Sequence, residues 1–253
     1  MASGPLETEG VSRYILPMSE TEHTDNQGLS DETLRRSLLD EMLFEAAFDG
    51  WTPQCLKRAA RAVGLADAQI EAGEIERLFP GGIGDVLDLW SQVEDEAMIA
   101  AWDALEEKPR KIRDKITWLV RTRIEGLGFN REVARRAAAT LALPPYALRA
   151  QRLAWRSADQ MWRAIGDRSL DANFYTKRAT LTGVYLSTLA RWFADEANEG
   201  DEVPYAETWA FLDKRIDNVM QIEKVKAQAN KVLPNFEKLT GLAAKLRYPG
   251  AAR

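Results

Sequence analysis

Apolar residues recur at intervals of three and four along most of the chain, a spacing typical of amphipathic α-helices. Glycine, proline and short polar side chains interrupt the pattern where helices are expected to begin and end. No segment alternates apolar and polar residues as a half-buried strand does. The sequence therefore predicts an all-α protein of about nine or ten helices. The expected helices cover about 31–48, 53–63, 67–78, 85–107, 109–125, 131–141, 146–165, 172–195 and 204–222, with a further segment from about 223.

The stretch 157–195 predicts a hairpin of two helices. Gly166 is expected to end the first, because glycine adopts the left-handed conformation at little cost. Asp171 is predicted to be the N-cap of the second. The apolar stripe expected on the first helix comprises Leu148, Trp155, Ala158, Trp162 and Ile165. The stripe expected on the second comprises Leu181, Val184, Tyr185, Thr188, Leu189 and Trp192.

Two aromatic rings and two cations crowd the first turns of that second helix, in Asn173-Phe174-Tyr175-Thr176-Lys177-Arg178. Positive side chains at a helix N-terminus oppose the helix dipole. A well-capped hairpin with no functional role accounts for most of the pattern but not for this crowding. The cluster therefore predicts a surface used for contact.

The composition indicates a substantial hydrophobic core, because 45% of the 253 residues are hydrophobic and eight are tryptophan. Cys55 is the only cysteine, which excludes a disulfide framework and fits a reducing compartment. The longest runs without a charge, 137–148 and 179–190, have twelve residues each, whereas a membrane-spanning helix needs about 20. We expect no spanning helix, a disordered tail at 1–30, and no signal or transit peptide.

Charge is unevenly distributed. Residues 224–253 contain seven Lys and Arg residues against Glu237, a net charge of +6, so that the formal total of −5 leaves −11 for residues 1–223. Phe236, Leu239, Leu242, Ala243 and Leu246 are expected to share one helical face, flanked by Lys238 and Lys245. A basic amphipathic helix of this kind is typical of binding to an anionic membrane surface. The alternative is an ordinary terminal helix packed on the body.

Motifs for catalysis are missing from the sequence. His23 is the only histidine and lies in the polar tail, so neither a Ser-His or Cys-His pair nor a di-iron site is expected. Gly81-Gly82-Ile83-Gly84 lacks the lysine of a phosphate-binding loop, and Cys55 is interpreted as a core residue. Glu94-Asp95-Glu96 is interpreted as a solvated helix face. We expect no enzyme activity, no metal and no cofactor.

The helix after Pro109 is expected to bury Ile112, Ile116, Leu119, Val120 and Leu127 and to expose Arg110, Lys111, Arg113, Lys115, Arg121 and Arg123.

The N-terminal part resembles the helix-turn-helix domain of TetR-type repressors in Phe48-Asp49-Gly50-Trp51-Thr52, in Ala59 to Leu65 and in Leu78-Phe79-Pro80. In that domain the third helix enters the DNA major groove. Here residues 65–78 carry four acidic residues and one basic residue, Arg77. Contacts to phosphates need Lys and Arg, so no nucleic-acid partner is expected. A TetR-type ligand-responsive transcription regulator remains the alternative function.

Longer stretches resemble the ubiquinone (coenzyme Q) biosynthesis accessory lipid-binding protein family. They are SADQMWRAIGDRSLDANFYTKR, VYLSTL and DEVPYAETWAFLDKRIDNVM, with FDGWT, LFPGG and LTGL outside them, and together they cover about 31–246. The resemblance implies a TetR-regulator-like fold without catalytic residues. It implies a protein that binds an isoprenoid quinone precursor or a phospholipid and assists the di-iron hydroxylase of the pathway. A homodimer is expected by analogy with TetR-like folds.

The residue patterns and the resemblance together predict four regions: a disordered tail at 1–30, a helix-turn-helix-like part at 31–84, a lipid-binding and partner-binding part at 85–222, and a basic amphipathic segment at 223–253. The protein is expected to be cytoplasmic and peripheral on the inner membrane, on the matrix side if mitochondrial. Family members often carry tryptophan where this chain has Phe174, which removes an indole N–H at that position.

Three sets of site residues follow from the resemblance. The patch expected to meet the hydroxylase comprises Trp162, Asp167, Asp171, Asn173, Phe174, Tyr175 and Arg178. The lipid cavity is expected to be lined by Trp155, Leu181, Tyr185, Trp192, Trp209 and Leu212. The membrane-binding set comprises Phe236, Lys238, Leu239, Leu242, Lys245 and Leu246.

Overall fold

A computed structural model describes residues 30–168, 172–196 and 203–232, and for 222–232 the backbone alone. Every regular element in these ranges is helical, which confirms the all-α prediction. The predictions that concern Asp171, the N-terminal tail and the six membrane-binding residues lie outside the described residues. The TetR-like form of the fold stays a prediction. Within the described residues, no helix combines the length and the apolar character needed to cross a bilayer.

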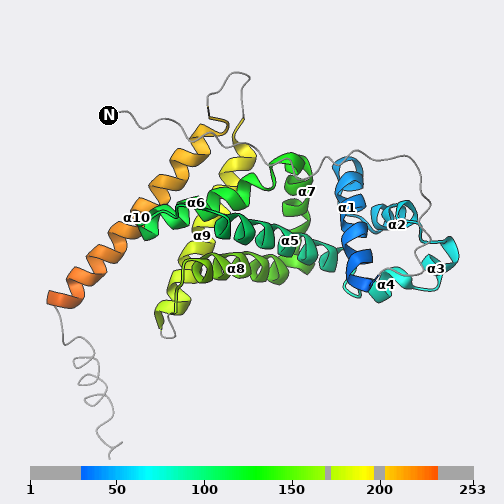
Figure 1. Cartoon of the computed structure of the whole chain (residues 1–253), viewed down its shortest axis with the longest axis horizontal. Coiled ribbons are helices and arrows are strands. Elements are labelled where there is room, and N and C mark those ends of the chain that lie inside the picture. Colours follow the sequence, from blue (N-terminus) through cyan, green and yellow to red (C-terminus); the bar gives the residue numbers. More distant parts are fainter. Residues whose placement is uncertain (1–29, 169–171, 197–202, 233–253) are drawn as a thin grey trace, which may run out of the picture.

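The first four helices form one end of the molecule (Figure 1). They are α1 Asp31–Asp49, α2 Pro53–Ala62, α3 Asp67–Glu71 and α4 Glu74–Leu78. The oxygen of Ser30 accepts a hydrogen bond from the Thr33 N–H, and that of Thr52 accepts one from the Cys55 N–H, so both long helices begin at a capping residue. The single helix expected at 67–78 is in fact two, because Gly73 adopts φ +90° between them.

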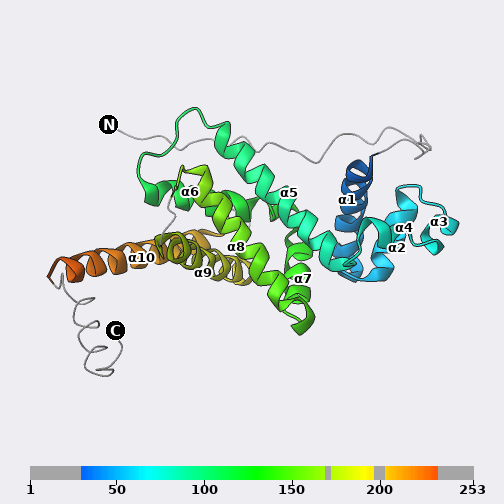
Figure 2. The same cartoon turned by 90° about the horizontal axis from the view of Figure 1, so that it is seen from below.

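The remaining helices form the body. They are α5 Ile83–Asp103, α6 Ile112–Glu125, α7 Arg131–Leu141, α8 Ala147–Ala164, α9 Ala172–Ala194 and α10 Ala206–Val232, with 3₁₀ turns at Gly128–Asn130 and Pro144–Tyr146. Helix α5 runs from the N-terminal helices along the body, and α10 leaves the body at the opposite end (Figures 1 and 2). Residues 223–232 therefore continue the helix that precedes them.

Trp51 joins the two parts. Its indole N–H donates to the carbonyl of Val133 on α7 at 3.1 Å, and its ring stacks on Trp90 of α5 with 5.2 Å between ring centres. Cys55 is fully buried close by, as expected of a core residue. The helix-turn-helix-like end is thus packed on the body through large aromatic surfaces.

The α8–α9 hairpin forms as predicted at its turn, where Gly166 adopts φ +84° and its N–H donates to the Arg163 carbonyl. The stripe expected on α9 is confirmed as the inward face, with Leu189 only half-buried. The stripe expected on α8 is partly wrong, because Leu148 is 76% exposed. The buried positions of α8 are Leu153, Ala154, Ser157, Ala158 and Met161.

Candidate functional site

A cavity of about 270 Å³ lies among α5, α6, α7, α8 and α9. Its volume is close to the lower end of the range for ligand pockets. Leucine and phenylalanine form much of its wall, and five alanines of α7 and α8, with Ala142 just after α7, contribute small side chains to it. The apolar lining includes Leu87, Leu127, Ala134, Ala137, Ala138, Leu141, Ala142, Ala150, Leu153, Ala154, Leu186, Leu189 and Phe193.

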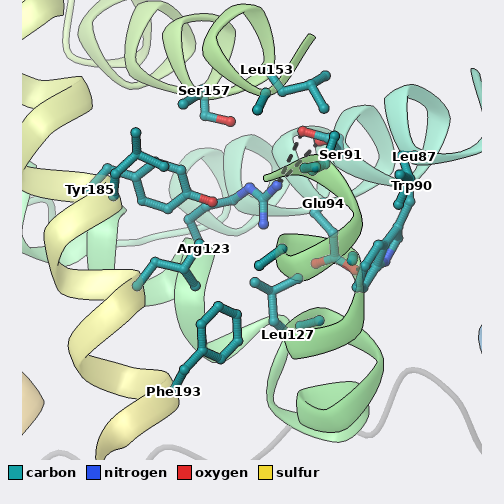
Figure 3. A pocket seen from close by; sticks show the side chains of 18 of the residues that line it. Leu87, Trp90, Ser91, Glu94, Arg123, Leu127, Leu153, Ser157, Tyr185 and Phe193 are labelled. Carbon is teal, nitrogen blue, oxygen red and sulfur yellow. Dashed lines mark hydrogen bonds between the residues drawn. The ribbon is translucent and has the colours of Figure 1, made fainter. Parts of the chain in front are cut away.

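Arg123 is the buried cation at this cavity (Figure 3). Only 4% of its side chain is exposed. Its Nε donates to Oδ1 of Asp95 at 2.8 Å, and the same oxygen accepts a hydrogen bond from the Ser157 hydroxyl at 2.7 Å. Burial would lower the pKa of Arg123, but the facing Tyr185, Asp95 and Glu94 outweigh it and raise that pKa, so the guanidinium stays charged.

Glu94 completes the polar cluster on the α5 side. Its Oε1 accepts a hydrogen bond from the indole N–H of Trp90 at 3.1 Å. Gly126 leaves room for the carboxylate, since a Cβ at that position would lie 2.9 Å from Oε2. Burial raises the pKa of Glu94 above its ordinary value of 4.5, although Arg123 and Trp90 oppose this.

The sequence expectation for both charged stretches was therefore wrong. Glu94 and Asp95 are buried, whereas Glu96 is exposed, and Arg123 is buried rather than on the outer face of α6. A signal for this existed in the sequence: Arg123 lies three and four residues after Val120 and Leu119, on the apolar face of the helix. Conversely, Ile112 was expected to be buried and is 56% exposed.

Replacing Glu94 with glutamine is expected to raise the free energy of unfolding at neutral pH. Because the folded-state pKa is raised, the glutamate loses stability as pH rises from about 4.5 through that pKa, whereas glutamine stays neutral. The difference between the two proteins should vanish below pH 4.5, in urea unfolding measured across pH.

Glu96→Gln is the matched control for this titration. Hydrogen bonds from Gln92 and Arg36 lower the pKa of Glu96, so its contribution to stability is present above its ordinary pKa and is lost in acid. The Glu96 variant should therefore lose stability at neutral pH. A Glu94 variant that behaves in the same way would contradict the burial of that carboxylate.

A second cavity, of about 240 Å³, lies between α6, α9 and α10. Leu181, Val184 and Ile216 form its apolar floor. Ile112 and Met220 lie at its exposed edge, which explains why two large apolar side chains of this region are accessible to solvent.

Trp162 and the start of α9 form an ordered patch beside the second cavity. The Trp162 N–H donates to the Lys177 carbonyl at 3.2 Å, and the Lys177 ammonium pairs with Asp167 at 2.7 Å. Trp162, Asn173 and Lys177 line the cavity edge. Tyr175 is 64% exposed and forms the outermost part of this surface, with its ring centre 5.1 Å from that of Phe174.

Arg178 lies beneath this patch and corrects the expectation of an exposed contact. Only 2% of its side chain is exposed. Its Nε donates to Asp159 at 2.5 Å and its Nη1 to Asp167 at 3.1 Å. The guanidinium carbon lies 3.6 Å from the centre of the Phe174 ring, a cation–π contact. Phenylalanine can make this contact without the indole N–H of tryptophan.

The six residues expected to line one lipid cavity are dispersed. Tyr185 lines the first cavity and Leu181 the second. Trp155 instead lies beside the patch, 6.5 Å from Tyr175 between ring centres. The other three are buried in the core and line neither cavity: Trp192, Trp209 and Leu212.

The described residues add nothing in favour of a metal site or of phosphate contacts by the third-helix region. Glu45, Asp49 and Cys55 are the one group of possible metal ligands there. The guanidinium of Arg58 already lies among them, 2.6 Å from Glu45 and 2.5 Å from Asp49. The basic residue of the acidic third-helix region, Arg77, is likewise paired with Asp31 and Glu74.

Comparison with known proteins gives a consistent result. The COQ9 family model matches residues 147–223, which contain α8, α9 and most of α10. Ubiquinone biosynthesis protein COQ9-A, mitochondrial, of Xenopus laevis is 26% identical, over 97% of this chain and 79% of the relative. The corresponding proteins of Rattus norvegicus and Homo sapiens are 28% and 27% identical, over 87% and 85% of this chain and 68% and 69% of theirs. These matches confirm the family resemblance seen in the motifs.

Proposed function

We propose that this chain, with its COQ9 family domain at 147–223, acts in ubiquinone biosynthesis as a non-catalytic lipid-binding protein. It holds a prenylated quinone precursor at the membrane and presents it to the di-iron hydroxylase. The role in ubiquinone biosynthesis is supported by the curated relatives, because their names state this role. The observation that carries the lipid-binding part is the apolar cavity inside the helices of the body.

The physical reason for such a protein is the cost of exposing a polyprenyl tail. Each CH₂ group removed from water contributes about 0.8 kcal/mol. A tail that leaves the bilayer therefore needs another apolar environment, and the lining of leucine, alanine and phenylalanine offers one. Helix α9 lines both cavities, through Tyr185 and Leu181, and its first turns carry the exposed patch.

The patch is the surface proposed to meet the hydroxylase. Tyr175 is exposed, while Trp162, Lys177 and Arg178 are held by hydrogen bonds and ion pairs. Little side-chain entropy remains to be lost there on binding. The second cavity opens beside the patch, so any part of the ligand that reaches its edge would lie next to the docked enzyme.

Membrane association is proposed through the basic segment at the C-terminus, and the relatives' names include the word mitochondrial. We propose a peripheral location on the inner membrane. Deleting 233–253 removes Lys238, Lys245, Arg247 and Arg253 together with the apolar residues between them. At about 1 kcal/mol for each basic residue near an anionic surface, sedimentation with anionic vesicles should be lost. Unchanged sedimentation would contradict this part.

Filling the first cavity should prevent lipid binding. Ala138 lines the cavity, and the next residue on α7, Ala139, is exposed. We expect Ala138→Trp to reduce co-purified lipid about tenfold or more, since displacing even two CH₂ groups exceeds the roughly 1.4 kcal/mol of a tenfold change. Ala139→Trp should leave the lipid content unchanged. The measurement is mass spectrometry of solvent extracts of the purified proteins. Equal lipid in both variants would reject the cavity, and a clean extract from the parent protein would favour a scaffold without lipid.

A further inference from the structure

Arg123 has one hydrogen-bonding group that the fold does not use. Its Nη1 is buried and has no hydrogen-bond partner among the described residues. A buried unpaired donor costs free energy comparable to a lost hydrogen bond, and more when it carries charge. Figure 3 shows the guanidinium between Tyr185 and Glu94, at the centre of the residues that line the first cavity.

We propose that Arg123 is the polar anchor of this cavity and donates from Nη1 to one carbonyl oxygen of the bound lipid. The proposal rests on the lipid-binding function above and adds the chemistry that the cavity selects. The ligand would be an apolar chain with a neutral carbonyl group that lies inside the protein, next to α5 and α6.

The position of the guanidinium is fixed from the other side. Nε is held by Asp95, and Asp95 is held in turn by Ser157 of α8, while Nη2 is 3.5 Å from the hydroxyl and the carbonyl of Ser91. These contacts fix the plane of the guanidinium, so Nη1 has a defined direction before a ligand arrives. A preorganised donor of this kind favours one oxygen position over others.

The charges around Arg123 favour a neutral head. Asp95 pairs with it directly, and Glu94 lies on the same wall of the cavity. A phosphate group at Nη1 would approach both acidic side chains in a medium of low dielectric, which is unfavourable. A quinone carbonyl or an ester carbonyl carries only a partial negative charge and can accept a hydrogen bond from Nη1. These two groups are the possible sources of the oxygen.

A matched pair of small ligands isolates this interaction. Hexanophenone and hexylbenzene differ only in a carbonyl group in place of a methylene group. We expect Arg123→Lys to weaken hexanophenone binding about tenfold and to change hexylbenzene binding less than about twofold. Lysine keeps a positive charge for Asp95, but its single nitrogen cannot donate to Asp95 and to the ligand from the two separate positions that the planar guanidinium provides. Arg121→Lys, on the same helix but outside the lining of the cavity, should change neither affinity. Ligand-observed NMR titration gives the affinities.

A second measurement keeps the test valid if the Arg123 variant does not fold. The infrared carbonyl stretch of hexanophenone bound to the unaltered protein should lie at lower frequency than in hydrocarbon, because a hydrogen bond to the carbonyl oxygen lowers that frequency. A hydrocarbon-like stretch would overturn the anchor, as would equal effects of Arg123→Lys on both ligands. In those cases binding of hexylbenzene would leave the lipid-binding function standing, whereas failure of both ligands to bind would reject the cavity as well.

Two further probes distinguish the sources of the carbonyl. A pentyl-substituted 1,4-benzoquinone represents the quinone ring, and dihexanoylphosphatidylcholine represents a phospholipid ester. If Arg123→Lys weakens binding of the quinone, the bound oxygen belongs to a ring carbonyl. If it weakens binding of the phosphatidylcholine, the oxygen belongs to an ester carbonyl. Affinity for both probes that is independent of Arg123 overturns the proposal.

Discussion

Replacing Arg178 with alanine is expected to lower the free energy of unfolding by about 3 kcal/mol. The guanidinium is 2% exposed and bridges Asp159 and Asp167, whose side chains are 18% and 8% exposed. Removing one partner of a buried ion pair costs about 3–5 kcal/mol, because an uncompensated charge remains inside the protein. The lower end applies here, since Asp167 keeps Lys177 and Asp159 keeps Arg163. Urea unfolding followed by circular dichroism gives the value.

Arg163→Ala is the matched control, because it removes a second arginine from the same carboxylate. The Arg163 side chain is 65% exposed and 2.6 Å from Asp159. An exposed ion pair contributes about 0–1 kcal/mol, so the expected loss is small. Equal losses in the two variants would show that Arg178 does not act as the buried support of the patch.

Replacing Tyr175 with alanine is expected to weaken binding of the proposed partner, the di-iron hydroxylase, about 30-fold without loss of stability. An exposed tyrosine at the centre of an interface costs about 2 kcal/mol or more when truncated. Tyr175 is 64% exposed and has aromatic neighbours on two sides, Phe174 and Trp155. Its ring is therefore presented to solvent on a surface that is otherwise fixed. Surface plasmon resonance with the purified hydroxylase measures the affinity.

Phe48→Ala provides the comparison at a distant surface. Phe48 is 71% exposed on α1, and α1 lies at the end of the molecule away from the start of α9 (Figure 1). We expect the hydroxylase affinity of this variant to equal that of the parent protein. If Phe48→Ala weakens binding and Tyr175→Ala does not, the hydroxylase binds the N-terminal helices and the patch has another role.

The Arg178 and Tyr175 predictions describe two layers of one structure. Arg178 lies below the ring of Phe174, and Tyr175 lies against the edge of that ring. Loss of Arg178 should therefore also weaken partner binding. This effect is indirect, and its size should follow how far the start of α9 becomes disordered in the variant. Arg178→Lys would keep the charge while losing the planar stacking on Phe174, so it separates charge from geometry.

Much of the fold follows from the sequence alone, because local rules decide it. Ser30 and Thr52 cap their helices, Gly166 ends α8 and the face of α9 from Leu181 to Trp192 is buried as its spacing predicts. Each of these depends on residues within one or two helical turns. The family resemblance likewise depends on local strings of residues, which the COQ9 match at 147–223 confirms.

Only the tertiary structure decided which charged residues are buried. Arg123 and Arg178 occupy helix faces that also carry apolar residues, and a helical pattern cannot say whether a carboxylate from another helix will meet them there. Asp95 on α5 reaches Arg123 on α6, and Asp159 on α8 reaches Arg178 on α9. Because a buried charge is tolerated only with a partner, its position depends on contacts between helices, and so do the cavity anchor and the support of the patch.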